Sequence, residues 1–263
     1  MVLAVSHEPH GDGLHEDLVK LASRRDALKL FGAGGAAAIL ATLGGAGSAL
    51  AAKRPTGTAP SETAGPYPGD GSNGPDVLTE SGIVRHDIRR SFGDSRTLAT
   101  GVPLRVNLTV TDASKDYRPL SGVAVYAWHC DRQGKYSMYG SGVTDENYLR
   151  GIVKTDSDGL AWFKTIYPAC YSGRWPHIHF EVYASVAKAV ANGPIVKTSQ
   201  IAMPAAACRK VYASSLYPGS TRNLSQVSLS TDNVFSDDRA IRQLATVTGN
   251  VREGFVANLT VGV

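Results

Sequence analysis

The sequence predicts an all-β protein, an antiparallel-rich β-sandwich with few short helices and an extended N-terminal arm. Three observations support this prediction. Eight short apolar or alternating segments occur after residue 103, and clusters of Gly, Pro, Asn, Asp and Ser separate them. Helical periodicity is confined to two short segments, and no internal repeat or heptad pattern occurs. The length of 263 residues suits one folded domain preceded by a leader.

The eight predicted strands share lengths of four to nine residues and turn signals at their ends. They are Leu104–Val110, Gly122–Trp128, Gly151–Lys154, Leu160–Ile166, His177–Tyr183, Lys197–Met203, Leu244–Thr248 and Phe255–Val263. Asp156-Ser-Asp-Gly159 supplies turn residues between the third and fourth strands, which predicts a β-hairpin there. Ala184–Asn192 and Ala207–Ala213 are each predicted to form about two turns of helix, and little other helix is expected.

Three regions follow one another along the chain. Residues 1–51 are predicted to be a twin-arginine signal peptide, with the motif at Arg24-Arg25, a Gly/Ala-rich apolar run, and a small-residue cleavage site at Ala49-Leu50-Ala51. The apolar run is too short for a permanent membrane span, so no stable membrane association is expected. Residues 52–95 are predicted to be an extended Gly/Pro-rich arm, and residues 96–263 the β-sandwich. The leader predicts export to the periplasm or the extracellular space.

The charge of the chain bears on whether it binds nucleic acid. The net charge is +4, without a long basic run, which disfavours nucleic-acid binding.

The three cysteines, Cys130, Cys170 and Cys208, would all reach an oxidising compartment if the chain is exported. One disulfide and one remaining thiol is the simplest arrangement, and we expect the disulfide to join Cys170 to Cys208.

A pair of histidines is the most informative feature of the predicted strands. His177 and His179 share one face of a strand, because alternate side chains point the same way, and two adjacent imidazoles suit a metal ion. Tyr171 and Arg174 lie in the turn that leads into this strand. Glu181 shares the face of the histidines, which leaves open a ferrous or zinc site with Tyr171 as acid or base. Two structural histidines are an equally ordinary interpretation of the pair alone.

Further motifs match a known family in order and spacing. The residues that carry the match are Tyr136 after Gly134, Arg150-Gly151, Thr155-Asp-Ser-Asp-Gly159, Phe163-Lys-Thr165-Ile166-Tyr-Pro168, Tyr171, Arg174 and His177-Ile-His179-Phe180. Together they resemble the intradiol ring-cleavage dioxygenases, which include the catechol and protocatechuate dioxygenases that use non-haem Fe(III). The matching block covers about residues 119–204, and the resemblance is to the secreted, single-domain branch without an N-terminal helical domain.

The resemblance implies a ligand set and an activity. Tyr136, Tyr171, His177 and His179 would bind Fe(III), and both atoms of O2 would enter a catechol-type substrate to give a cis,cis-muconate-type product. Tyr171 would leave the metal and take up a substrate proton. A bound cation favours the deprotonated phenolates, which otherwise form only near pH ~10.

The resemblance also implies roles for two polar residues and shows two departures. Arg174 would stabilise negative charge on the substrate ring, and Gln200 would orient substrate near the same site. Ala169 stands where the family commonly has Gly, and Pro68 stands where a second aromatic commonly follows the tyrosine of Gly65-Pro66-Tyr67. The substrate pocket is therefore expected to differ from that of relatives.

A non-enzymatic function is the alternative. The segment Pro119–Trp128 would look similar in a prealbumin-like β-sandwich module that binds polysaccharide or phenolic compounds without catalysis. Metal analysis of the purified protein discriminates between the two interpretations, because a protein without stoichiometric iron would favour the binding module.

Overall fold

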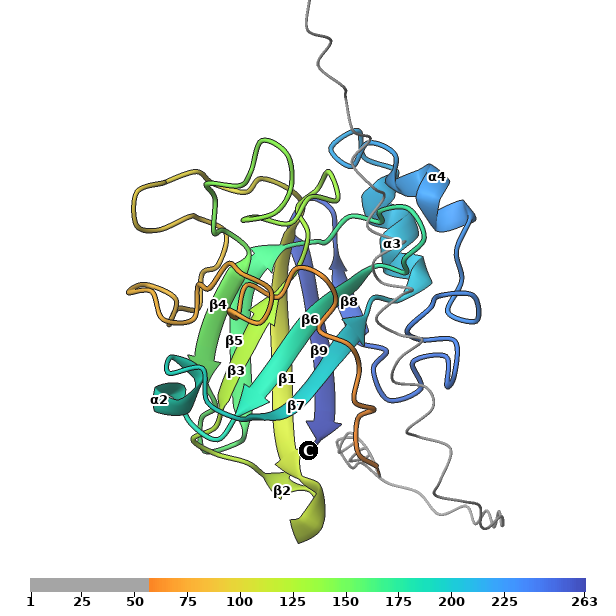
Figure 1. Ribbon diagram of the computed structural model, residues 1–263. Coiled ribbons are helices and arrows are strands. Elements are labelled where there is room, and N and C mark those ends of the chain that lie inside the picture. Colours follow the sequence, from red (N-terminus) through yellow and green to blue (C-terminus); the bar gives the residue numbers. More distant parts are fainter. Residues whose placement is uncertain (1–56) are drawn as a thin grey trace, which may run out of the picture. The chain divides into compact units, whose positions relative to one another are not determined.

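The computed structural model describes residues 57–263, so the predicted signal peptide lies outside the described residues. The secondary-structure elements of the described part are β1 (Pro103–Asp112), η1 (Ala113–Lys115), β2 (Arg118–Pro119), β3 (Ala124–Trp128), β4 (Arg150–Lys154), β5 (Leu160–Ile166), β6 (His177–Tyr183), α2 (Val186–Ala189), β7 (Ile195–Ala202), α3 (Ala205–Tyr212), α4 (Ser220–Ser225), β8 (Thr246–Asn250) and β9 (Gly254–Gly262). The predicted class, an antiparallel-rich β-sandwich with few short helices, is confirmed (Figure 1).

The strands form two sheets. In the first, the order is β2-β1-β9-β8 and β5 also pairs with β1, while the second has the order β4-β3-β6-β7. All pairs are antiparallel except β1 with β9. The eight predicted strands are confirmed with small shifts at their ends, and the two-residue strand β2 was not predicted. Both predicted helices form, at Val186–Ala189 and Ala205–Tyr212, whereas α4 was not predicted.

The predicted hairpin at Asp156–Gly159 is wrong. β4 pairs with β3 in the second sheet, whereas β5 pairs with β1 in the first, so the turn carries the chain from one sheet to the other. The local turn chemistry was recognised correctly, because Asp156 Oδ1 accepts from the backbone N–H groups of Asp158 and Leu160 and Gly159 has φ +72°. A tight turn fixes the direction of the chain but not which strand the next segment pairs with.

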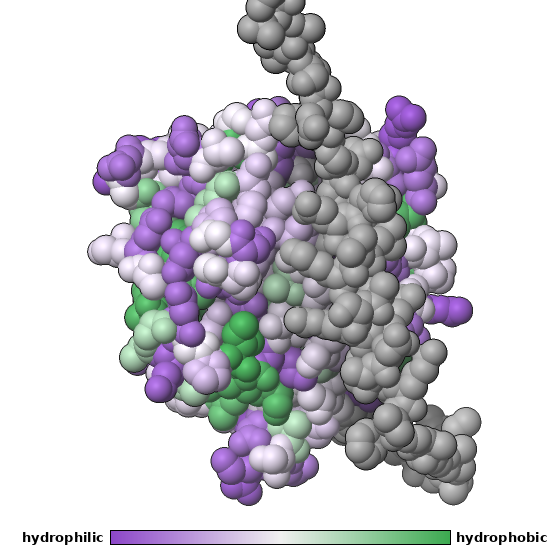
Figure 2. Space-filling model, in the orientation of Figure 1, coloured by the Kyte–Doolittle hydropathy of each residue, from purple (hydrophilic) through white to green (hydrophobic). Residues whose placement is uncertain are grey.

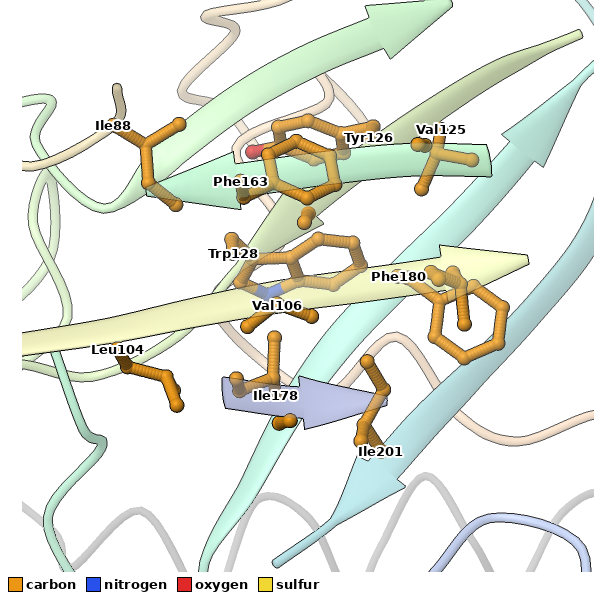
Figure 3. Packing of buried hydrophobic residues seen from close by; sticks show 14 of the residues in the cluster. Ile88, Leu104, Val106, Val125, Tyr126, Trp128, Phe163, Ile178, Phe180 and Ile201 are labelled. Atoms are coloured by element: carbon orange, nitrogen blue, oxygen red, sulfur yellow. The ribbon is translucent and has the colours of Figure 1, made fainter. Parts of the chain in front are cut away.

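The hydrophobic core lies between the sheets. Leu104 and Val106 of β1 and Phe163 of β5 are buried against Ile178 and Phe180 of β6 (Figure 3). Because side chains alternate along a strand, the apolar face of β6 points into this core and its histidines point to the other face of the second sheet. The candidate site therefore lies outside the core, on a face that other segments of the chain must cover.

The segment before β1 crosses both sheets and hydrogen-bonds to their strands. Its backbone N–H groups bond to carbonyl groups in four strands: Ala59 to Gly262, Glu62 to Thr198, Arg85 to Ile152, and Ile88 to Lys164. Val77, Leu78 and Ile83 of this segment are fully buried. The segment thus shields the exposed edges of β4, β5 and β7, which would otherwise be free to pair with other chains.

The predicted disulfide is wrong, since all three cysteines are free and buried. Cys208 Sγ lies 3.3 Å from Tyr167 Oη, and Cys170 Sγ lies 3.5 Å from the carbonyl oxygen of Arg174. Burial raises the pKa of both thiols to about 12, which disfavours the thiolate that disulfide formation needs.

Among residues 57–263, no helix combines the length and apolar character needed to cross a bilayer. Figure 2 shows a mostly hydrophilic face with an apolar patch where β6 ends and β7 begins. Ile195 and Val196, at the start of β7, are 43% and 52% exposed.

A buried guanidinium fastens the N-terminal segment to the second sheet. Arg150 of β4 is 1% exposed and donates to the carbonyl oxygens of Tyr67, Pro68 and Ser137 at 2.7–3.0 Å. It also donates to Ser137 Oγ at 3.1 Å and to Tyr126 Oη at 3.0 Å. One side chain therefore joins the N-terminal segment to the loop that follows β3.

We expect Arg150→Met to lower the free energy of unfolding by about 3 kcal/mol, because the buried carbonyl groups lose their donors. Urea denaturation measures this change. The control is Arg252→Met on an exposed residue, which should stay within about 0.5 kcal/mol of the unmodified protein. Equal stability of the two variants would show that Arg150 does not fasten the segment.

Candidate metal centre

Four ring side chains, Tyr136, Tyr171, His177 and His179, converge in the structure, and we call them the ring cluster. The Nε2 atoms of His177 and His179 lie 3.0 Å apart. Tyr136 Oη lies 3.1 Å from His179 Nε2 and 3.3 Å from His177 Nε2, and Tyr171 Oη lies 3.3 Å from His177 Nε2. The structure thus brings together all four residues that the sequence predicts as ligands.

Three parts of the chain supply the ring cluster. The two histidines come from β6, Tyr136 from the loop between β3 and β4, and Tyr171 from the loop between β5 and β6. The two loops touch at Gly134, where an added Cβ would lie 2.9 Å from the Cβ of Tyr171. Gly134 also has φ +82°, so both its conformation and its contact favour glycine.

The loop that carries Tyr136 is built around a buried carboxylate. Asp131 Oδ1 accepts from the backbone N–H groups of Gln133 and Lys135, and its Oδ2 accepts from Tyr148 Oη. Tyr136 itself is only 3% exposed. The phenol is therefore held rigidly against the histidines before any ligand arrives.

Two helices support the loop that carries Tyr171. Tyr212 of α3 donates to the carbonyl oxygen of Pro168, and Ser220 Oγ of α4 accepts from the backbone N–H of Cys170. Asn223 Nδ2 of α4 donates to the carbonyl oxygen of Cys170. Ala169, where the resemblance implies Gly, is not among the residues with positive φ, so its side chain causes no backbone strain.

His179 belongs to a row of four side chains that crosses the second sheet. Trp128 of β3 is paired with both Arg150 of β4 and His179, and His179 is paired with Gln200 of β7. The Trp128 and His179 rings stack with centroids 4.9 Å apart and planes 8° apart. The stack fixes the plane of the imidazole that faces Tyr136.

The protonation state of His177 follows from its neighbours. Its Nδ1 lies 2.5 Å from the carbonyl oxygen of Trp175, which only accepts hydrogen bonds, so Nδ1 carries the proton and Nε2 presents a lone pair to the cluster. Burial, with a contribution from Arg174, lowers the pKa of His177 to about 3. The pKa of His179 is also well below its ordinary value, chiefly through burial, and its Nδ1 has no hydrogen-bond partner among the described residues.

The surroundings of Tyr136 favour its neutral, protonated phenol. Burial raises its pKa well above the ordinary value of 10, and the nearby Tyr171 raises it further. A phenolate at this position therefore needs a cation beside it. Neutral imidazoles and cation-dependent phenolates are the donor set of a site for a hard, highly charged metal ion.

Arg174 lies beside the cluster and is 2% exposed. Its Nε donates to Asp232 Oδ2 at 3.0 Å and its Nη2 donates to Gln200 Oε1 at 2.7 Å. Gln200 Nε2 donates in turn to the carbonyl oxygen of Thr63 at 3.1 Å. Gln200 was predicted to orient substrate, whereas here its amide links Arg174 to the N-terminal segment. Asp232 was not predicted, because no local sequence pattern marks it.

Residues of the N-terminal segment reach the cluster. The rings of Tyr67 and Tyr136 have centroids 5.0 Å apart, tilted by 34°. Pro68, where the resemblance implies an aromatic residue, is buried, and its carbonyl oxygen accepts from Tyr126 Oη and Arg150. The Gly65-Pro66-Tyr67 segment thus approaches the site, as the sequence resemblance implied.

Glu181, and a further histidine of the described chain, His129, have structural roles. Both ring nitrogens of His129 are engaged, one with the carbonyl oxygen of Cys130 and one with Thr165 Oγ1. Glu181 accepts from Tyr183 Oη at 2.7 Å and from Thr198 Oγ1 at 3.5 Å. These hydrogen bonds engage both carboxylate oxygens of Glu181, which disfavours the ferrous or zinc site with Glu181 as a ligand. Within the described part of the chain, no three His, Cys, Asp or Glu residues are grouped to hold a metal ion.

Comparisons with known proteins find similarity to dioxygenases. A family model described as Dioxygenase matches residues 73–193, which include the whole ring cluster. Catechol 1,2-dioxygenase 1 of Acinetobacter lwoffii is 39% identical over 70 residues, or 26% of this chain, and the match spans only 22% of that relative.

Solved structures share the fold. An intradiol ring-cleavage dioxygenase from Tetranychus urticae is 22% identical, with a TM-score of 0.59 over 78% of this chain and 94% of that chain. The dioxygenase domain of a dioxygenase carbohydrate-binding protein fusion from Streptomyces sp. SirexAA-E is 23% identical, with a TM-score of 0.50 over 79% and 98%. The matched family model and the curated relative make this chain similar to the intradiol ring-cleavage dioxygenases, and the solved structures show that it shares their fold.

Proposed function

We propose that the protein is an Fe(III)-dependent dioxygenase that cleaves catechol-type aromatics between the two hydroxylated carbons, with O2 as co-substrate and a cis,cis-muconate-type product. The observation that carries this proposal is the convergence of two phenol oxygens and two imidazole nitrogens, each of which lies within 3.3 Å of at least one other. The matched family model and the similarity to a catechol 1,2-dioxygenase support the same reaction class.

The chemistry of the ring cluster fits ferric iron. Two phenolates would offset two of its three positive charges, and two neutral imidazoles would complete a mixed nitrogen and oxygen set. Arg174 adds a buried positive charge beside the cluster, so the loaded site would favour an anionic ligand. When bound, ferric iron supplies Lewis acidity, which lowers the pKa of its phenol ligands and of catechol hydroxyl groups.

The two tyrosines have different surroundings, which suits different roles. Tyr136 is buried and contacts both imidazoles, so it is held in place. Tyr171 is only partly buried and its Oη contacts His177. Tyr171 is therefore the phenol that can move away and accept one of the two protons that a catechol releases on binding.

Arg174 suits the stabilisation of negative charge on the substrate ring. Burial alone would lower its pKa, but Tyr171 and Asp232 outweigh that effect and raise the pKa above its ordinary value. The guanidinium thus stays charged at every working pH, and its planar shape is held between Asp232 and Gln200. We expect it to favour the electron-rich substrate that reacts with O2.

Export remains a prediction. We propose that residues 1–51 direct the folded protein through the twin-arginine route, so that iron is bound before the chain leaves the cytoplasm; a fusion of these residues to a reporter enzyme tests this directly.

Oxygen uptake by the purified, iron-containing protein tests the proposed function. With a panel of catechols, we expect consumption of O2 and a product heavier than the substrate by both oxygen atoms, measured by mass analysis with labelled O2. A protein that contains stoichiometric iron but cleaves none of the panel would overturn the reaction class, and one without iron would favour a binding module.

Removal of either buried ligand should abolish metal binding. We expect Tyr136→Phe and His179→Ala to lose stoichiometric iron or the visible tyrosinate-to-iron absorption, because each loses a donor that the cluster cannot replace. Iron content and visible spectra measure this. Glu181→Gln is a control on the same face of β6 and should keep both, since Glu181 bonds to Tyr183 and Thr198 instead. If only the Glu181→Gln variant lost iron, Glu181 would be a metal ligand and the proposed ligand set would be wrong.

Tyr171→Phe tests the role of the mobile phenol. We expect the variant to retain iron with an altered visible band, while turnover falls by about 100-fold or more because a proton acceptor is missing. Tyr117→Phe, which removes another partly buried phenol in the turn between η1 and β2, is the matched control and should keep the visible band and the turnover of the unmodified protein. Full activity of Tyr171→Phe would refute its role as a departing base.

A further inference from the structure

Asp232 is a completely buried carboxylate in the segment that follows α4. Its Oδ2 accepts from Arg174 Nε at 3.0 Å and from the backbone N–H of Trp175 at 2.7 Å. Its Oδ1 accepts from the backbone N–H groups of Val234 and Phe235 at 2.9 and 3.0 Å. Four donors therefore saturate one side chain, which has no room to bind metal or substrate itself.

The ion pair fixes the direction of the guanidinium. Arg174 is 2% exposed, and its Nη2 donates to a second buried acceptor, Gln200 Oε1, at 2.7 Å. A charge-assisted pair in a buried site is strong and directional, and loss of one partner leaves the other charge buried without compensation. The position of Arg174 beside the ring cluster thus depends on a residue 58 positions away in sequence.

The same carboxylate also helps to position His177, one of the predicted metal ligands. It accepts from the backbone N–H of Trp175, and the carbonyl oxygen of Trp175 accepts from His177 Nδ1 at 2.5 Å. That bond sets the tautomer and the orientation of the imidazole. Phe235, whose N–H bonds to Asp232, packs its ring edge-on against His177 with centroids 6.4 Å apart. Three contacts from one short segment therefore converge on residues 174–177.

We propose that Asp232 is a positioning residue of the active site, which aims the Arg174 guanidinium at the substrate and orients His177. This inference rests on the proposed function, since it assigns a role within that reaction. The carboxylate does not touch the ring cluster and acts only through Arg174 and Trp175.

Steady-state kinetics of Asp232→Asn test the proposal. The amide keeps the shape and the acceptor Oδ1 but removes the charge, so the variant should still bind iron. We expect kcat to fall by about 10- to 100-fold, as is typical when an outer partner of a metal site is lost, with a much smaller change in KM. Asp237→Asn, an exposed residue of the same segment, is the matched control and should keep the kcat of the unmodified protein.

A double-mutant cycle separates positioning from a general structural role. If Asp232 acts chiefly through Arg174, the loss of kcat caused by Asp232→Asn should be much smaller in the Arg174→Met background than in the unmodified protein, and any remaining loss reports the path through Trp175 and His177. Asp232→Glu keeps the charge, so its kcat should lie between those of Asp232→Asn and the unmodified protein. This variant also provides the test if Asp232→Asn folds poorly. Additive losses in the cycle, or a wild-type kcat in iron-loaded Asp232→Asn, would overturn the inference. Absence of activity in the unmodified, iron-loaded protein would instead overturn the proposed function on which the inference rests.

Discussion

His177 and His179 leave the same face of β6 with their Nε2 atoms 3.0 Å apart in a site from which water is largely excluded. Because the Nδ1 atom of His177 donates to the carbonyl oxygen of Trp175, its Nε2 lone pair faces the neighbouring imidazole. Two such groups repel unless a proton or a cation lies between them. The nearby phenols can supply protons in the metal-free state, and a cation would replace those protons. The rest of the site is organised around this pair.

Three distant parts of the chain keep the surrounding loops in place. Arg150 joins the N-terminal segment to the loop that carries Tyr136, and α3 and α4 hold the loop that carries Tyr171. Asp232 fixes residues 174–177 between these loops and β6. Catalysis by positioned groups requires little motion in the groups themselves, and buried hydrogen bonds supply that rigidity. Tyr171, which is only partly buried, is the member of the ring cluster with freedom to move.

Local features of the sequence were predictable. Alternation located the strands and placed the two histidines on one face, and turn residues located the turn at Asp156–Gly159. The tyrosines were identified only through resemblance to a family, because a single tyrosine in a loop has no local signature. The pairing of β5 with β1 was missed, since a turn does not specify the partner of the strand that follows it.

Long-range polar partners were also missed. Asp232 and Thr63 contact Arg174 and Gln200 across separations of 58 and 137 residues, and no periodicity in the sequence reports such contacts. The expected disulfide failed for a related reason, because the number of cysteines does not show that each thiol is buried beside a different polar neighbour. Residue types and strand faces could thus be predicted, whereas the polar contacts that aim them could not.

Anomalous diffraction at the iron edge, on crystals of the iron-containing protein, tests the central claim most directly. The account predicts a single iron peak within bonding distance of the phenol oxygens of Tyr136 and Tyr171 and of the Nε2 atoms of His177 and His179. A peak bound by other residues, or crystals of active protein without any iron at the ring cluster, would contradict it.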